Sequence, residues 1–249
     1  MFPPRMQTYL RKKLAGFTLM ETVIAIGVLA VMLTAFMAVF GPATRGIRRS
    51  INVQEADRLT SAMEKELATN RPTASGTGSE AVTAFHKAYD WIENSHQANT
   101  VVFAYQYRGN PNSLRRDGTM EPYLQRTGQA GQDFVVQPMF RRRNDPLFEQ
   151  DLKALESRVF FVKMTQLVFD GANGLRLGTP GVITPPPQPP GTPVLTGAKA
   201  DSFPEAVIPF TAEFFEIQTT DPKFLRTGGK FDLIRYTKPM FTRNVAVRR

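Results

Sequence analysis

The sequence contains no cysteine and only two histidines in 249 residues. Without cysteine the chain can form neither disulfide bonds nor thiolate metal sites, so burial and hydrogen bonds alone must hold any exported domain. His86 and His96 lie ten residues apart and would point to different sides of an expected helix, so we expect no metal site and no cofactor. The sequence also lacks a G-x-S-x-G elbow, a P-loop, a dinucleotide-binding glycine pattern and a recognisable pair of catalytic carboxylates. We therefore name no catalytic residue and do not expect an enzyme.

Acidic residues are outnumbered, since 22 aspartates and glutamates stand against 31 lysines and arginines, for a formal net charge of +9. Nearly half of this excess lies in the first sixteen residues, which contain no acid and four basic residues: Arg5, Arg11, Lys12 and Lys13. The remaining basic bias permits binding to nucleic acid or an anionic surface but does not require it. The length suffices for one domain plus a membrane segment, or for two small domains.

One long apolar stretch follows this basic segment, from Phe17 to Phe40, and Glu21 is its only charged residue. As a helix the stretch would span roughly 36 Å, enough to cross the hydrocarbon core of a bilayer. A cleaved secretory signal would have a shorter apolar core and a small-residue cleavage site at its far end. An ordinary membrane anchor would not need Glu21, and a lone acid in a membrane segment usually marks a function.

The segment from Gly16 to Thr22, GFTLMET, resembles the N-terminal signal of type IV pilins and type II secretion pseudopilins. The resemblance implies that a membrane prepilin peptidase cuts between Gly16 and Phe17 and then methylates the new amino group of Phe17. It also implies that Glu21 faces the Phe17 amine of a neighbouring subunit, where the pairing would set the axial register of a filament. The implied partners are this peptidase and methyltransferase, other pilin or pseudopilin subunits, an inner-membrane assembly platform and membrane lipid.

The same resemblance gives the orientation. Basic residues flank both ends of the apolar stretch, with Arg11, Lys12 and Lys13 before it and Arg45, Arg48 and Arg49 after it, so charge alone would leave the orientation ambiguous. A pilin-like protein would be a single-pass protein of the bacterial inner membrane with a cytoplasmic N-terminus. Its head would lie in the periplasm, or on the cell surface within a filament.

The helical pattern continues beyond the membrane stretch, and we predict one long helix over residues 17–70 that ends before Arg71-Pro72. Gly41 and Pro42 should interrupt it, either as a kink at the membrane exit or, by analogy with pilins, as a break that lets the segment stretch in a filament. The apolar face should comprise Ile51, Ala56, Leu59, Met63 and Leu67, with Glu55 and Glu66 intruding; the polar face should comprise Asp57, Arg58, Ser61, Glu64 and Lys65.

The expected domains are a leader over 1–16, a membrane or filament-core helix over 17–40, its continuation over 41–71, and a head over 72–249. We predict that the head is α+β, with an antiparallel sheet and helices packed on one side. A helix over 80–95 should bury Val82, Phe85, Tyr89 and Ile92, with Trp91 and His86 off this face, and a short helix should cover 147–155. The predicted strands are 101–107, 133–140, 158–170, 206–217 and 231–236.

Two features of the head leave alternatives open. The proline-rich loop over 178–197 is best interpreted as a surface insertion between strands, although a rigid spacer or a peptide ligand would have the same composition. The run Arg141, Arg142 and Arg143 is interpreted as a solvated turn, or alternatively as an anion contact in a DNA-binding pilin with Tyr105, Tyr107 or Phe140 stacking on bases.

The expected function is that of a structural subunit, a minor pilin or pseudopilin. The head has no cysteine pair of the kind that closes a loop in many pilins, and it is large, which favours a minor subunit over an abundant one. The alternatives are a DNA- or surface-binding pilin of an uptake or adhesion system, and a membrane-anchored enzyme.

Overall fold

The computed structural model describes residues 18–69, 71–72, 81–171, 174–187 and 199–249. The chain divides into two compact units, residues 1–50 and 51–249, and each is described by itself. Helix α1, Leu19–Glu66, supplies all of the secondary structure described in the first unit and enters the second. It starts and ends within the predicted range but stops at Glu66, four residues short of the predicted end.

Pro42 lies inside α1, which continues through Gly41 and Pro42 as helix. A break of the helix at this point is therefore wrong, whereas the kink at Gly41 and Pro42 stays a prediction. Proline removes only one N–H donor, the one that would otherwise reach the carbonyl of Ala38, and the turns on either side keep their own hydrogen bonds. The hydroxyl of Thr44 adds hydrogen bonds to the carbonyl oxygens of Phe40 (3.1 Å) and Gly41 (3.0 Å) beside the proline.

In the second unit α1 packs on the head with the predicted face. Ala56, Leu59, Met63 and Leu67 are buried, whereas Ile51 is exposed, so the apolar face begins later than predicted. The opposite face is exposed as predicted, at Asp57, Arg58, Ser61, Glu64 and Lys65.

Glu66, one of the two acids that intrude on the apolar face of α1, has a cationic partner in the head. Lys87 donates from Nζ to the Glu66 carboxylate (2.8 Å) and also to the carbonyl oxygens of Glu66 (3.2 Å) and Thr69 (3.3 Å). The lysine thus satisfies two carbonyls at the C-terminal end of α1, where intrahelical donors are missing. Because Lys87 belongs to helix α2, Ala84–Asn94, this contact fixes α2 against the end of α1.

Helix α2 starts at Ala84, after Thr83 caps it by accepting a hydrogen bond from the His86 N–H, so the predicted start near residue 80 is wrong. Ala81–Val82 instead forms strand β2, which pairs with β1, Arg71–Pro72. The buried residues of α2 are Phe85, Ala88, Trp91 and Ile92. Trp91 is therefore inside the core, contrary to prediction, while Tyr89 is only half-buried.

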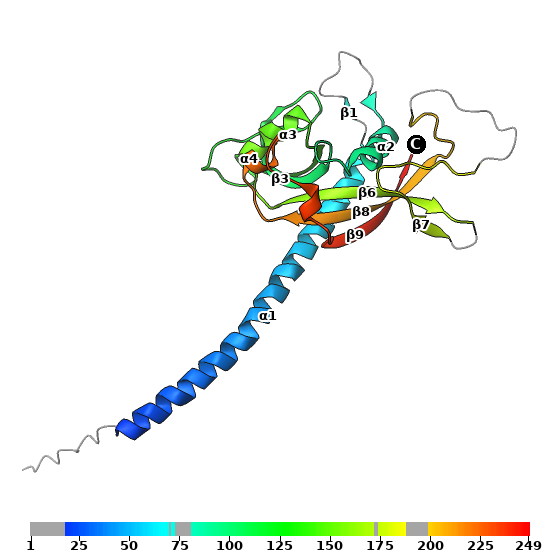
Figure 1. Cartoon of the computed structure of the whole chain (residues 1–249). Helices are drawn as coiled ribbons and strands as arrows, with labels where there is room; N and C mark the ends of the chain where they lie inside the picture. The colour runs from blue at the N-terminus through cyan, green and yellow to red at the C-terminus, as the bar shows by residue number, and fades with distance from the viewer. Residues whose placement is uncertain (1–17, 70, 73–80, 172–173, 188–198) are drawn as a thin grey trace, which may run out of the picture. The chain divides into compact units, whose positions relative to one another are not determined.

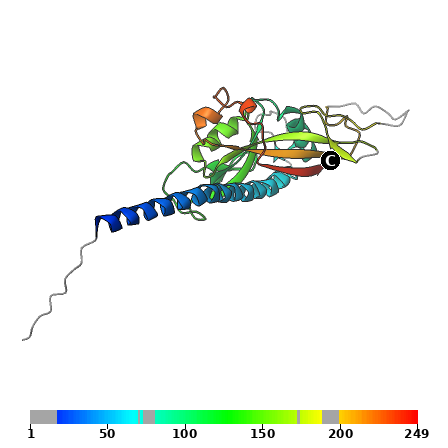
Figure 2. The same cartoon turned by 60° about the horizontal axis from the view of Figure 1, so that its bottom comes forward.

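The head is built on a seven-stranded antiparallel sheet in the order β4-β3-β6-β8-β9, with β5 paired to β3 and β7 paired to β6. Figures 1 and 2 show β6, β8 and β9 side by side. The strands are β3, Val102–Leu114; β4, Met120–Pro122; β5, Val135–Arg142; β6, Val159–Phe169; β7, Leu175–Leu177; β8, Val207–Ile217; and β9, Phe241–Arg248. The α+β class with an antiparallel sheet is confirmed.

Four of the five predicted strands are present, but the segment 231–236 is not a strand. It contains a short 3₁₀ turn, Leu233–Arg235, which Asp232 caps by accepting a hydrogen bond from the Ile234 N–H (3.0 Å). Phe231 and Leu233 are buried, so the apolar alternation reflected burial and not an extended backbone. The last strand of the sheet is β9.

Helices cover both faces of the sheet, so the expectation that they lie on one side is wrong. On one face the core includes residues of α1 and α2, such as Met63 and Phe85, packed with Val102 and Phe210. On the other face it includes residues of three short elements packed against Phe103 and Phe161. These elements are α3, Pro146–Asp151; the following 3₁₀ turn, Leu152–Ala154, which completes the predicted helix over 147–155; and α4, Pro222–Leu225.

Candidate functional site

The apolar part of α1 is uncovered within the chain. From Leu19 to Phe40 every described side chain is exposed, for example 86% at Leu19 and 72% at Val39. By length and composition this is the one helix among the described residues that could span a membrane. A contiguous apolar surface of this size marks contact with lipid or with other proteins. We therefore regard this segment as the candidate functional site.

Glu21 lies in the first turn of α1 and is exposed. It is the only charged residue from Thr18 to Thr44. Its backbone N–H donates to the Thr18 hydroxyl at 3.3 Å, so Thr18 begins to satisfy the free N–H groups of the helix start. A carboxylate at this end of a helix is also favoured by the helix dipole. Glu21 thus presents one negative charge at the N-terminal end of an apolar surface.

The polar side chains within this surface need no outside partner. Thr22 and Thr34 donate their hydroxyl hydrogens to the carbonyl oxygens of Thr18 (3.2 Å) and Ala30 (2.7 Å), one turn back. These bonds remove the penalty of placing a hydroxyl in an apolar environment. The carboxylate of Glu21 is the exception, because no described residue nearby carries a positive charge. The predicted processing residues, Gly16 and Phe17, lie outside the described residues.

The predicted anion contact in the head is wrong for Arg141 and Arg143, because both are buried and bound within the protein. Arg143 donates only to backbone oxygens of the described chain, those of Ala98, Leu225, Arg226 and Gly229, at 2.7–3.1 Å. Burial without an acid beside it lowers the pKa of Arg143.

Arg142 is the least buried member of the run, and its guanidinium contacts Asp90 of α2 at 2.8 Å. Arg141 and Arg142 end strand β5 and Arg143 lies in the turn after it, but Arg141 and Arg143 are buried, so the interpretation as a solvated turn is wrong for these two. Tyr105, Tyr107 and Phe140, the residues considered for stacking on bases, are buried.

Arg141 lies at the centre of a buried ionic network. Its guanidinium contacts Asp117 (2.9 Å), Asp145 (3.2 Å) and Asp151 (3.0 Å), and Arg115 reaches the other oxygen of Asp151 at 2.7 Å. Asp145 caps α3 and Asp151 ends it, whereas Asp117 lies in the turn after β3. The network therefore ties that turn and α3 to strand β5, which is a structural role.

The aspartates of this network have different pKa shifts. Burial raises the pKa of Asp151 more than Arg141 and Arg115 lower it. Burial would also raise the pKa of Asp117, but hydrogen bonds from Thr119 and the charge of Arg141 outweigh it and lower that pKa. Tyr105 donates to Asp151 at 2.6 Å, and burial together with that carboxylate raises the pKa of Tyr105 well above its usual value.

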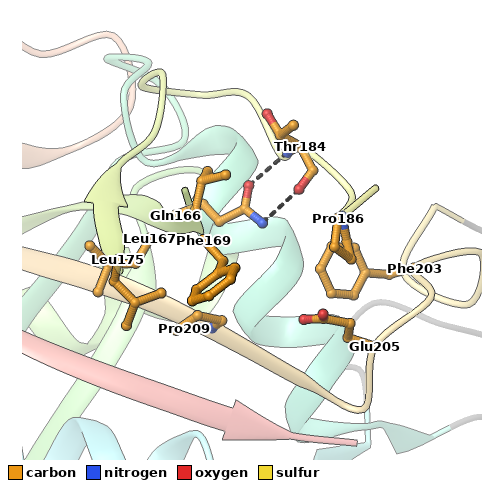
Figure 3. Close-up of a pocket in the computed structure, with 10 residues that line it drawn as sticks. Gln166, Leu167, Phe169, Leu175, Thr184, Pro186, Phe203, Glu205 and Pro209 are labelled. Atoms are coloured by element: carbon orange, nitrogen blue, oxygen red, sulfur yellow. Dashed lines mark hydrogen bonds between the residues drawn. The ribbon is translucent and has the colours of Figure 1, made fainter. Parts of the chain in front are cut away.

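A second feature of the head is an apolar pocket of about 240 Å³ beside the β6–β7 hairpin. Figure 3 shows Gln166 at its margin, where Nε2 donates to the Thr184 carbonyl (2.9 Å) and Oε1 accepts from the Thr184 N–H (2.6 Å). Glu205 is the one ionisable side chain among the described lining residues, so these residues do not provide the pair of groups that acid–base chemistry needs. Thr184 belongs to the proline-rich segment that connects β7 with β8; residues 188–197 of it lie outside the described residues.

Among the described residues, no group of three or more histidine and acidic side chains could hold a metal ion. His86 contacts Asp201 at 2.9 Å and the Thr83 hydroxyl at 2.5 Å. His96 is more buried and donates from Nε2 to the Met164 carbonyl at 3.0 Å. The two histidines therefore have separate local partners.

His96 should make the protein less stable at mildly acidic pH. Burial, opposed by the Met164 carbonyl and assisted by Lys163, lowers the pKa of His96 below its usual 6.5. As pH is lowered, His96 is protonated in the unfolded chain at a higher pH than in the folded chain. The contribution of neutral His96 to the free energy of unfolding is therefore fully present above about pH 6.5 and is lost as pH falls toward the pKa of the folded state. We expect His96→Gln, which retains an amide donor, to reduce the slope of unfolding free energy against pH by up to about 1.4 kcal/mol per unit at pH values below about 6.5. Urea unfolding of the full chain in detergent at a series of pH values measures the slope, and an unchanged slope in the variant would contradict the assignment.

Sequence reasoning missed the residues that organise the head, Lys87 and the partners of Arg141. A lysine on a half-buried helix and isolated aspartates in turns have no distinctive local pattern, and only the fold brings them to Glu66 and Arg141. No known protein family, curated protein or solved structure matches the chain significantly.

Proposed function

We propose that the protein is a type IV pilin-like structural subunit, a minor pilin or pseudopilin. In this proposal the chain inserts in the inner membrane of a bacterium, is processed between Gly16 and Phe17, and assembles through the first part of α1 into a pilus or secretion pseudopilus. The observation that carries the proposal is that the GFTLMET segment begins an uncovered apolar stretch of α1, up to Phe40, whose single charge is Glu21. The size of the head supports a minor subunit.

The apolar helix would have two environments in turn. In the membrane, lipid would cover its surface, and in a filament the helices of neighbouring subunits would replace lipid. Glu21 fits the second environment because a carboxylate among apolar helices requires a cationic partner, and the free amine of a processed Phe17 would supply one. A plain membrane anchor would need neither the carboxylate nor the glycine before the apolar stretch.

The alternative of a DNA-binding pilin loses its main support, because the guanidinium groups of Arg141 and Arg143 are used inside the head. An anchored enzyme has no support from a described cluster of catalytic groups. A structural subunit is the function that the residues favour.

Processing can be tested by measuring the intact mass and the N-terminal sequence of the protein recovered from its native membrane. We expect the chain to begin at N-methylated Phe17. Gly16→Ile should block the cut, since a branched side chain prevents close approach of the backbone to the peptidase. Ala15→Ile, one residue away in the leader, is the matched control and should be processed. A wild-type protein that retains its leader would contradict the proposal.

A further inference from the structure

The strands that end the sheet differ in how well they could accept another strand. Within the described sheet β4, β5, β7 and β9 each pair with a single neighbour. β4 and β7 have three residues each, and β5 contains Pro138, which lacks a backbone donor. β9 has eight residues, no proline, and an uninterrupted register with β8 from Phe241 to Arg248. Short strands and prolines are two of the common protections of sheet edges, and β9 has neither; its protection is the charge of Arg243 and Arg248.

The backbone groups of β9 that face away from β8 can be assigned from its register. The Arg249 N–H donates to the Ala206 carbonyl at 2.8 Å, which marks a hydrogen-bonded pair just beyond the strand. Hydrogen-bonded and non-hydrogen-bonded pairs alternate in an antiparallel ladder, so Ala246 belongs to a non-hydrogen-bonded pair. Its partner in the register is Pro209, which has no N–H, and this agrees with the assignment because residues of a non-hydrogen-bonded pair donate no hydrogen bond to each other. The outward-facing groups therefore belong to Thr242, Asn244, Ala246 and Arg248.

A groove of about 630 Å³ runs beside this strand. One wall is the segment from Asn244 to Arg249, and the other is formed by the end of α1 and the start of α2, at Glu64, Leu67, Ala68 and Ala84. The outward-facing backbone groups of β9 thus adjoin an open groove, where an added strand would have room for its side chains.

The charged side chains on β9 indicate the charge that an added strand should carry. From Met240 to Arg249 the chain has three arginines and no acid. Arg243 and Arg248 are exposed, and neither forms an ion pair with another described residue. Arg249 is engaged, since it donates from Nη2 to the carbonyls of Ala200 and Phe203. A second copy of β9 would bring two sets of arginines together, whereas an acidic strand would complement them.

We propose that β9 is a docking edge for an extended acidic segment of a partner protein, which adds to the sheet as a further strand. Its backbone would pair with the outward-facing groups between Thr242 and Arg248. Arg243 and Arg248 point to opposite faces of the sheet, so the carboxylates on one face of the added strand would lie beside Arg248. The proposal concerns the head alone and holds whether or not the chain assembles into a filament.

The test uses the full chain in detergent and a synthetic capped peptide of alternating glutamate and valine. Hydrogen exchange followed by mass spectrometry should show slower exchange of the segment 241–249 when the peptide is present. The same peptide with lysine in place of glutamate should bind at least about 10-fold more weakly. Ala246→Pro removes one outward N–H and should weaken binding of the acidic peptide at least about 10-fold.

Two further variants separate docking from loss of structure. Arg248→Glu leaves the backbone edge intact and should also weaken binding of the acidic peptide, whereas Arg116→Glu, an exposed reversal outside β9, should not. Failure of the peptide to bind, binding without slower exchange in β9, or equal binding by the lysine peptide or by Arg248→Glu would overturn the proposal. Slower exchange of β9 that depends on protein concentration without peptide would overturn it too, because it would identify a second copy as the occupant.

Discussion

Glu21→Ala is expected to leave the protein in the membrane but to abolish its assembly into filaments. Alanine makes the apolar segment more apolar, so insertion should not suffer. In the proposed filament, however, the variant would leave the amine of a processed Phe17 buried among apolar helices without a counter-charge. Breaking a buried ion pair by removing one partner costs about 3–5 kcal/mol, which is more than a 100-fold loss in each step of subunit addition.

Filaments sheared from cells and the membrane fraction should be compared by immunoblot. Thr22→Ala is a matched control, because Thr22 adjoins Glu21 and its hydroxyl bonds only to the Thr18 carbonyl at 3.2 Å. We expect this variant to assemble normally. Filaments at the wild-type level in Glu21→Ala would show that the carboxylate does not set the register, and equal failure of both variants would show that the effect is not specific to charge.

The long helix and most of the strands could be predicted because their residues carry a signal within a short window. The apolar stretch of α1 is continuous apart from Glu21, and strands such as β6 are rich in branched and aromatic residues, most of them buried. A break of the helix at Pro42 was one of two outcomes expected from a local rule, but one missing hydrogen bond does not stop a helix of 48 residues. β9 was missed because one of its faces is uncovered and three of its eight residues are arginine or asparagine, which weakens the apolar alternation.

The buried ionic network around Arg141 could not be predicted, because its residues show no local pattern of burial. Three consecutive arginines are typical of a solvated surface, because burying a guanidinium without a partner is costly. Asp145 is four residues from Arg141, but the other two partners of Arg141, Asp117 and Asp151, lie 24 and 10 residues away in the sequence, and nothing in either segment indicates that they meet. The three arginines therefore have different environments. Arg141 is surrounded by aspartates, Arg142 lies at the surface, and Arg143, just after β5, is surrounded by backbone carbonyls.

Arg141→Gln should destabilise the head by about 3–5 kcal/mol, since it removes the cation that three aspartates share and leaves Arg115, beside Asp151, to offset their negative charge. Urea unfolding of the full chain in detergent, followed by tryptophan fluorescence, should show a lower midpoint with an unchanged slope. Trp91, the single tryptophan, is buried in the head and reports on its unfolding.

Arg142→Gln is the matched control because it changes the neighbouring residue in the same way at an ion pair that is about 40% exposed on both sides. We expect an effect below about 1 kcal/mol, as for other surface pairs. The loss caused by Arg141→Gln should also shrink as pH falls, because burial already raises the pKa of Asp151 and the missing cation would raise it further, so a proton can replace the arginine charge. Equal effects of the two substitutions, or a loss in Arg141→Gln that does not depend on pH, would mean that Arg141 contributes packing alone and that its charge does not hold the turn at Asp117 and helix α3 together.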